Sequence, residues 1–205
     1  MSTREKILLM GPPGTGKSSQ LINIAKFLED TGKKVYAIDL EDKFEATIMG
    51  SGGLPKNMKL FSPNDWPELK SGPIENNAKR DSVMDILANE VKPENWIFVD
   101  RVDISWPMVQ RWHTRNRYHQ EMAERMADKL NKIKGSAMFV PKFDQGDWLV
   151  INEQYDSFIS MILSGLRCNV VMTAGVKGSG DDNPMEAYGN VKVGPRGQKE
   201  LPHQP

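Results

Sequence analysis

The chain alternates short apolar runs with segments in which apolar residues recur every three or four positions. Continuous apolar runs are typical of strands buried on both faces of a parallel sheet, and four occur, at residues 6–10, 35–39, 96–100 and 169–174. Shorter extended segments are predicted at residues 58–61 and 191–193. The rest of residues 50–72 is rich in Gly, Pro and Asn, which predicts a connection.

Amphipathic helices are predicted between these strands. One follows the first strand and ends near Thr31 and Gly32, one covers residues 83–91, and one covers residues 151–166. Residues 105–148 break the alternation, and we interpret them as a helical insertion with an apolar stripe of Tyr118, Met122, Met126, Leu130 and Ile133. Strands alternating with helices predict one α/β domain over residues 1–205, a three-layer sandwich with ligands at the carboxyl ends of its strands.

A phosphate-binding motif connects the first strand to the first helix. It fits the pattern G-x-x-x-x-G-K-[ST], and with the next residue it comprises Gly11, Pro12, Pro13, Gly14, Thr15, Gly16, Lys17, Ser18 and Ser19. The backbone N–H groups of such a loop surround the phosphates of a nucleotide. Lys17 is predicted to reach the β and γ phosphates, and the Ser18 hydroxyl to ligate Mg²⁺. An ordinary Gly-Pro turn would not explain the Lys-Ser pair.

Composition and charge limit the partners and the cellular compartment to be expected. The chain has 205 residues, with 27 Lys and Arg against 27 Asp and Glu, so no overall basicity points to nucleic acid or to an anionic membrane. Residue 168 is the single cysteine, and its apolar neighbours predict a buried, reduced thiol. With no apolar stretch of membrane-spanning length and no signal-peptide core, we expect a cytoplasmic protein.

Polar residues stand at the predicted strand ends, where the phosphate loop must also lie. Asp39, Asp100 and Thr173 each follow an apolar run. We assign Asp100 to holding Mg²⁺, because four apolar residues before it place it on a rigid buried strand. The alternative for Asp100 and for Asp39 is that the carboxylate caps the next turn.

The order of these motifs resembles that of the RecA-like ATPases. The resemblance covers residues 6–176 and rests on the phosphate loop, the strand ending in Asp39-Leu40-Glu41, and the Val99-Asp100 strand. It implies that Glu41 activates the attacking water and that ATP is the nucleotide. Glu41 could instead be an exposed glutamate in a charged loop. Because Arg101 stands where many motor ATPases have glutamate, Asp103 is the second choice for the base.

The chain more narrowly resembles phage-encoded RecA-like nucleotide-binding proteins. The further segments that carry this resemblance are Gly146-Asp147-Trp148 and residues 194–199. It implies location in the host cytoplasm and a ring or filament in which Arg196, Lys199 or Lys177 touches the nucleotide of a neighbouring subunit. RecA-like proteins continue with further strands, so the Gly- and Pro-rich residues 176–205 are expected to be a short or truncated end. Those three cations could equally be surface residues.

A DNA contact is predicted at the start of the insertion. Arg111, Arg115 and Arg117 are interspersed there with aromatic side chains, a mixture that can grip a backbone and stack on bases. The alternative is an amphipathic helix with Trp112 and Tyr118 in the core and the arginines outside.

These observations together predict a Mg²⁺-dependent ATPase that couples hydrolysis to DNA recombination, replication or packaging. Three alternatives stay open: a DNA-packaging motor, a small-molecule kinase in which residues 105–148 form a lid, and a nucleotide-gated binding module that hydrolyses little. Against the kinase, this sequence shows no arginine-rich lid that closes directly on the phosphate loop. A packaging motor commonly has an arginine within the phosphate loop, which this chain lacks.

Overall fold

A five-stranded, all-parallel sheet forms the centre of the molecule. The computed structural model describes residues 4–71, 81–132, 143–178 and 193–195. The strand order is β1-β5-β4-β2-β3. The strands are β1 (Lys6–Met10), β2 (Val35–Asp39), β3 (Met58–Phe61), β4 (Trp96–Asp100) and β5 (Asn169–Ala174). The prediction of four parallel strands is therefore confirmed for the four apolar runs.

The short extended segment at residues 58–61 is a fifth strand of this sheet. Met58 lies in register with Val35, so β3 adds to the open side of β2 and becomes an edge strand. Two helices in the same region were not predicted, α2 (Phe44–Gly50) and α3 (Trp66–Leu69). Both are too short for a helical period to stand out, and each buries only two side chains.

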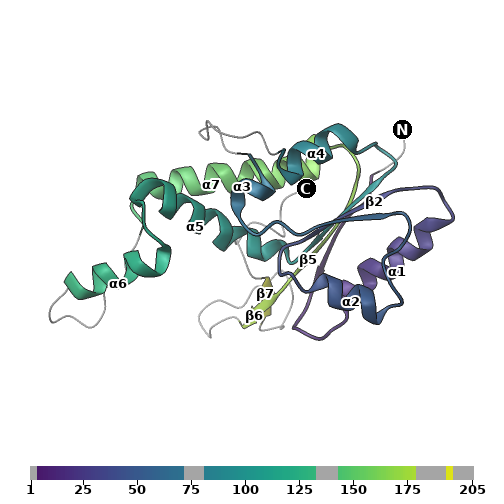
Figure 1. Cartoon of the computed structure of the whole chain (residues 1–205), viewed down its shortest axis with the longest axis horizontal. Coiled ribbons are helices and arrows are strands. Elements are labelled where there is room, and N and C mark those ends of the chain that lie inside the picture. The colour runs from purple at the N-terminus through teal and green to yellow at the C-terminus, as the bar shows by residue number, and fades with distance from the viewer. Residues whose placement is uncertain (1–3, 72–80, 133–142, 179–192, 196–205) are drawn as a thin grey trace.

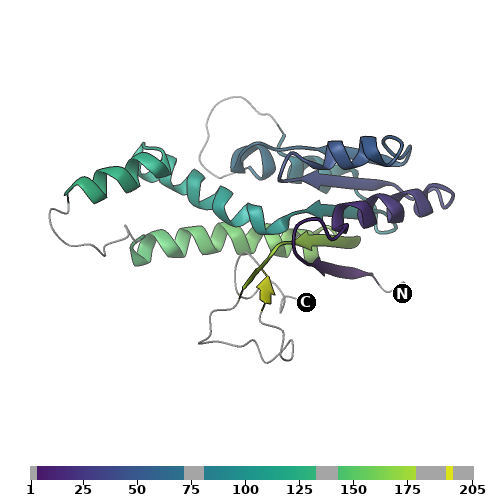
Figure 2. The same ribbon diagram turned by 90° about the horizontal axis from the view of Figure 1, so that it is seen from below.

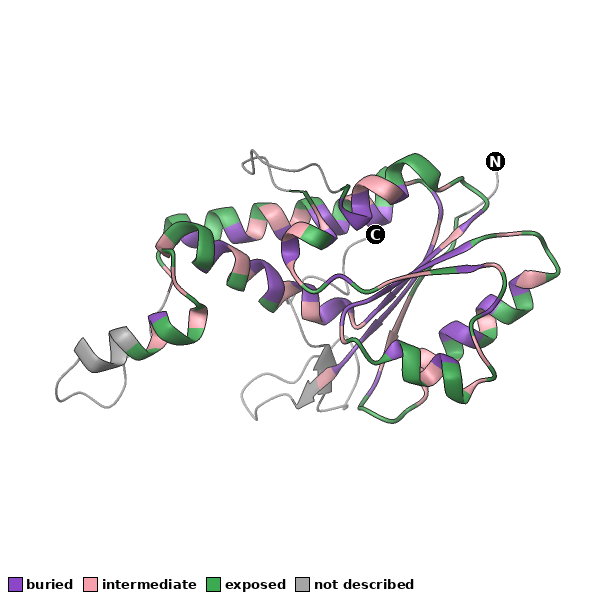
Figure 3. Cartoon of the chain, viewed as in Figure 1, coloured by how far each residue is buried: buried purple, intermediate pink, exposed green. Residues whose placement is uncertain are grey.

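Helices cover both faces of the sheet, which confirms the three-layer α/β sandwich (Figure 1). Alternate residues of β2 point to opposite faces, with Val35 and Ala37 facing α1 (Lys17–Glu29) and α2. Tyr36 and Ile38 belong to the core on the other face. That face is covered by α3, α4 (Val83–Glu90), α5 (Ser105–Tyr118) and α7 (Gln145–Ser160). The central strands β2, β4 and β5 are accordingly buried, while the outer helix faces are exposed (Figure 3).

Four smaller elements lie next to these helices and strands. A 3₁₀ turn, η1 (Val102–Ile104), joins β4 to α5, and a π-helical turn, η2 (Met161–Gly165), extends α7. Beyond β5, β6 (Val176–Gly178) pairs antiparallel with β7 (Val193–Pro195). The strand predicted at residues 191–193 lies mostly outside the described residues. Cys168 is buried as expected, and burial raises the pKa of its thiol to about 11.

The described residues of the predicted insertion form two helices and the first turn of α7, where one helix was expected from Tyr118 onward. Tyr118 is instead the last residue of α5, because His119 takes a left-handed conformation with φ of 53°. The next helix, α6 (Met122–Lys132), lies at the end of the molecule away from α1 (Figure 2). The first half of α5 belongs to the domain core, where Met108 and Val109 are buried.

A buried polar cluster joins α5, α6 and α7. Asp147, in the first turn of α7, is bonded to His113 Nε2 at 2.7 Å and accepts a hydrogen bond from the Tyr118 hydroxyl at 2.5 Å. Arg125 of α6 lies over the Tyr118 ring at 3.3 Å and 3.8 Å from Asp147. Burial raises the pKa of Asp147, but its hydrogen bonds from His113, Tyr118 and the Asp144 N–H outweigh burial and lower it below the ordinary value.

No helix among the described residues is long and apolar enough to cross a membrane.

Candidate functional site at the carboxyl ends of the strands

The phosphate loop lies between β1 and α1, as predicted. Gly14 and Gly16 have φ of 79° and 81°, values that side-chain-bearing residues rarely adopt. Gly16 is also the N-cap of α1, and no side chain bonds to the first turn of that helix. The N–H groups at the start of α1 therefore remain free to bind an anion.

The lysine of the motif folds back into its own loop. Its Nζ donates to the carbonyl oxygens of Gly11 and Pro12, both at 2.8 Å, and lies 3.4 Å from the Thr15 hydroxyl. Thr15 in turn donates to the Pro12 carbonyl at 2.9 Å. The ammonium group is thus held at the centre of the loop, where phosphate oxygens are expected.

Asp100 lies directly opposite the serine of the motif. Ser18 Oγ is 3.1 Å and 2.9 Å from the two carboxylate oxygens, and the Thr173 hydroxyl donates to Oδ1 at 2.6 Å. Burial raises the pKa of Asp100, and the nearby Asp39 and Glu41 charges add to that effect, while the Thr173 and Ser18 hydrogen bonds oppose it. Three polar side chains from α1, β4 and β5 therefore converge at one point.

Asp39 caps the turn that follows β2, which was the alternative considered for it. Its Oδ1 accepts from the Glu41 N–H at 3.0 Å, and its Oδ2 accepts from the Phe44 N–H at 2.8 Å. The carboxylate therefore closes the turn between β2 and α2. Since Asp39 lies in register with Asp100, this turn delivers Glu41 to the same end of the sheet.

Glu41 is held by two cations. Arg101 Nη1 donates to its Oε2 at 2.8 Å, and Lys43 Nζ lies 3.1 Å from its Oε1. Arg101 also makes a double contact with Asp103, through Nε and Nη2 at 3.0 Å each. This side chain links the loop after β2 to the turn after β4.

Asp103 is itself fixed by the protein backbone. Its Oδ1 accepts from the Gly175 N–H, at the end of β5, at 3.1 Å. Its side chain is only 3% exposed. Both oxygens are therefore occupied, and Asp103 is less accessible to a water molecule than Glu41, whose side chain is 26% exposed.

Sequence reasoning missed the part that Arg101 plays. The residue was noted only for standing where a glutamate was expected. It adopts a left-handed backbone with φ of 61°, and this turns its side chain toward Glu41 and Asp103. No spacing rule signals such a conformation in an arginine, which rarely adopts it. Thr173 was recognised at its strand end, and the structure adds its two bonds, to Asp100 and from the Arg101 N–H at 2.8 Å.

A family comparison agrees with this geometry. The model of the AAA domain family matches residues 3–204. The chain belongs to the AAA domain family. This match supports a nucleotide-binding P-loop ATPase. None of the curated proteins matches this AAA domain.

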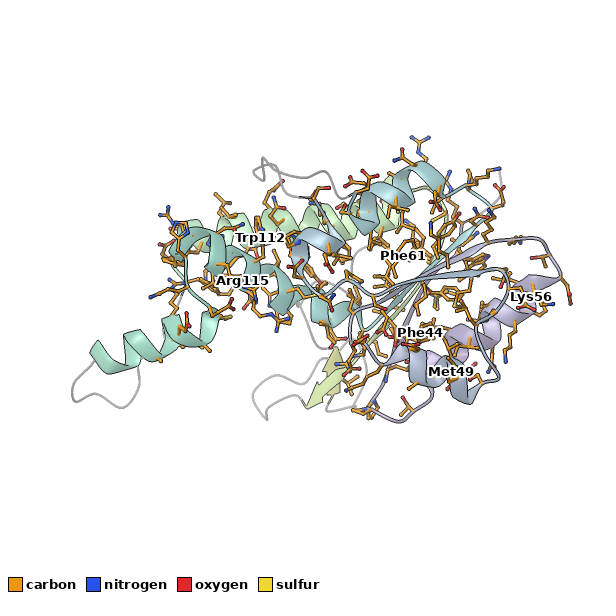
Figure 4. The ribbon with its side chains drawn as sticks, in the orientation of Figure 1. Phe44, Met49, Lys56, Phe61, Trp112 and Arg115 are labelled. Atoms are coloured by element: carbon orange, nitrogen blue, oxygen red, sulfur yellow. The ribbon has the colours of Figure 1, made fainter. Side chains whose placement is uncertain are left out.

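The basic segment of the AAA domain lies far from the phosphate loop, on α5. Arg111, Arg115 and Arg117 are all exposed. Arg111 and Arg115 are one helical turn apart and share a face, whereas Arg117 points to another side of α5. Arg115 Nε is bonded to Glu121 at 2.6 Å. Figure 4 labels Arg115 on α5, away from α1 and α2.

The aromatic residues around these arginines have internal partners. Trp112 packs against the core, and His113 and Tyr118 are bonded to Asp147. Of the mixture predicted to bind nucleic acid, the arginines and His119 are exposed. Arg196 and Lys199 lie outside the described residues, as does the side chain of Lys177.

Proposed function

We propose that this AAA domain hydrolyses ATP, with water activated by Glu41. The observation that carries the proposal is the pairing of Ser18 Oγ with Asp100 at 2.9 Å beside the phosphate loop. A serine and a carboxylate so placed are the protein oxygens that hold Mg²⁺ in a P-loop ATPase. Lys17 would leave its loop carbonyls for the β and γ phosphates, and the N–H groups of residues 11–19 would surround them.

The donor set suits Mg²⁺. The described residues contain no group of three or more His, Cys, Asp or Glu side chains that could hold a metal unaided. Ser18 and Asp100 offer hard oxygen donors, and Mg²⁺ takes few protein ligands alongside water and substrate phosphates. Bound Mg²⁺ would neutralise charge on the β and γ phosphate oxygens.

Glu41 is the better choice of base on grounds of access. Its side chain is 26% exposed, against 3% for Asp103. The oxygens of Asp103 are taken by Arg101 and the Gly175 N–H. Glu41 also follows β2, the neighbour of β4, so it approaches the Mg²⁺ site from the side opposite Thr173 on β5.

We further propose that the protein is a RecA-like ATPase of a phage, coupling hydrolysis to DNA recombination, replication or packaging. The position of β5 between β1 and β4 supports the RecA-like assignment. The exposed Arg111 and Arg115 on one face of α5 support contact with a DNA backbone. Among the described residues β1 pairs with β5 alone and its Ile7 is 36% exposed, and this edge supports association into a ring or filament. Arg196 and Lys199 are proposed to act across that interface.

A phosphate-release assay tests the proposed function. ATP and GTP would be supplied in turn, alone and with single-stranded DNA, duplex DNA or small-molecule acceptors. We expect hydrolysis of ATP that rises with DNA. Transfer of phosphate to an acceptor without DNA stimulation would favour the kinase alternative, and stimulation by duplex DNA alone would favour the packaging motor.

Variants of the two acidic residues test the assigned roles. Glu41→Gln should bind ATP but lose roughly 100-fold or more in turnover, as expected for a missing general base. Asp100→Asn should lose both Mg²⁺-dependent binding and turnover. The matched control is Glu45→Gln, an exposed glutamate four residues away on α2. Wild-type turnover in Glu41→Gln would refute its role as base.

A further inference from the structure

Arg101 joins the residue assigned as the base to a fixed point of the fold. Its guanidinium uses Nη1 for Glu41 and both Nε and Nη2 for Asp103. A planar guanidinium with a double contact on one side has little freedom to rotate. The direction of Nη1, and with it the position of the Glu41 carboxylate, is therefore set by Asp103.

Asp103 anchors the Arg101 side chain to the sheet. It is buried, and its Oδ1 accepts from the Gly175 N–H directly after β5. The Arg101 N–H donates to the Thr173 hydroxyl, which itself bonds to Asp100. The left-handed backbone of Arg101, with φ of 61°, is a strained conformation that persists only where surrounding contacts fix it. Arg101 is thus anchored through both its backbone and its side chain.

The two ion pairs of Glu41 differ in how far they are exposed to solvent. The Arg101 side chain is 14% exposed, whereas that of Lys43 is 73% exposed. An exposed ion pair is weak, so Lys43 is released easily. A carboxylate oxygen that accepts from a cation is a poor acceptor for a water proton. Release of Lys43 frees Oε1 while Oε2 stays on Arg101.

We propose that Arg101 is the positioning residue for Glu41, holding its Oε2 so that Oε1 faces the attacking water once Lys43 leaves. The inference rests on the proposed role of Glu41 as base. In the reaction the water oxygen bonds to the γ phosphorus, the bond from that phosphorus to the ADP oxygen breaks, and the water proton passes to Oε1. Arg101 touches none of these atoms and acts through Glu41.

The test compares turnover with ATP affinity in the full chain. Arg101→Gln should lower kcat roughly 10- to 100-fold, as a misplaced reacting group does, with ATP affinity within about twofold of wild type. The kcat of Arg101→Lys should lie between those of wild type and Arg101→Gln. A single ammonium group can bind Glu41 or Asp103 but cannot hold both. Lys59→Gln is the control, since it removes the surface pair with Glu90. Wild-type kcat in Arg101→Gln would overturn the proposal.

A double variant separates positioning from general damage. In a Glu41→Gln background, Arg101→Gln should cost less than about twofold in turnover, because its effect acts through the missing carboxylate. An undiminished loss in that background would mean that Arg101 acts elsewhere. If Glu41→Gln alone turns over normally, the proposed base is wrong. If Glu41→Gln is inactive but Arg101→Gln is normal, only this inference fails.

The kcat of Lys43→Gln gives an independent test that does not disturb the buried pair of Arg101 and Asp103. Removing the competing donor should raise kcat by about two- to fivefold, the equivalent of a surface ion pair of up to 1 kcal/mol. This variant also keeps the proposal falsifiable if Arg101→Gln does not fold. A tenfold fall in kcat would show that Lys43 is required and would overturn the assignment of Oε1.

Discussion

Replacing Thr173 by Val tests the hydrogen bonds at the centre of the site with little change in shape. The hydroxyl accepts from the Arg101 N–H at 2.8 Å and donates to Asp100 at 2.6 Å. Thr173 is fully buried within β5, where a second β-branched residue fits the strand. The substitution therefore removes two hydrogen bonds and leaves the packing in place.

The loss of stability in Thr173→Val can be estimated from the two hydrogen-bond partners of the hydroxyl, the Arg101 N–H and the Asp100 carboxylate. A hydrogen bond between neutral groups contributes about 1 kcal/mol and one to a charged group about 2 kcal/mol, so the variant should lose about 3 kcal/mol in the free energy of unfolding. For a domain of this size the melting temperature should fall by roughly 6–12 °C. Turnover should also fall, because Asp100 and Arg101 lose their common partner.

Urea denaturation and thermal melting of wild type, Thr173→Val and Thr173→Ser measure this loss. Thr173→Ser keeps the hydroxyl and loses only a methyl group, so it should retain most of the stability that the valine variant loses. A free energy of unfolding for Thr173→Val within about 0.5 kcal/mol of wild type would refute the reasoning, since that is the range of substitutions that disturb nothing. Equal losses in the two variants would assign the effect to packing.

Three further predictions concern the loop, the polar cluster and α5. Lys17→Ala should abolish ATP binding, measured by titration with a fluorescent nucleotide, while the melting temperature is kept; near-normal binding would contradict the site. Asp147→Ala should lose roughly 1–3 kcal/mol in the free energy of unfolding, because it leaves the buried His113 Nε2 without its partner. Because the pKa of Asp147 is lowered on folding, its stabilisation is full above about pH 4 and lost as pH falls through that lowered pKa, so the unfolding free energies of wild type and variant should converge in acid. Reversing Arg111 and Arg115 to Glu should weaken DNA binding and reduce its salt dependence by about two counterions; an unchanged salt slope would place the contact elsewhere.

The sequence predicts best those features that depend on neighbouring residues. The apolar runs predicted β1, β2, β4 and β5, and the phosphate motif predicted its own position between β1 and α1. The meeting of Asp100 and Thr173 also followed, because parallel strands end at the same edge. The extended segment at residues 58–61 was predicted, but its place in the sheet beside β2 was not, because β3 is short and only partly buried.

Features that depend on distant contacts could not be predicted. The role of Arg101 requires a left-handed backbone and two acidic partners, one of them brought in from the loop after β2. The end of α5 at Tyr118 depends on the conformation of His119, and the apolar stripe continued across that break. The choice of Asp39 as a turn cap needed the positions of the Glu41 and Phe44 N–H groups.

In the proposed nucleotide site, the folded-back lysine must exchange its hydrogen bonds to the loop for hydrogen bonds to the ligand. The Lys17 ammonium rests on the Gly11 and Pro12 carbonyls at 2.8 Å each, so a ligand must replace both contacts before it enters the loop. Phosphate oxygens compensate for that loss because their hydrogen bonds to an ammonium group are charge-assisted. A nucleoside without phosphates brings no such compensation and leaves the lysine in place. We therefore expect the loop to select its ligand by the charge of the phosphates before the base or the sugar makes contact.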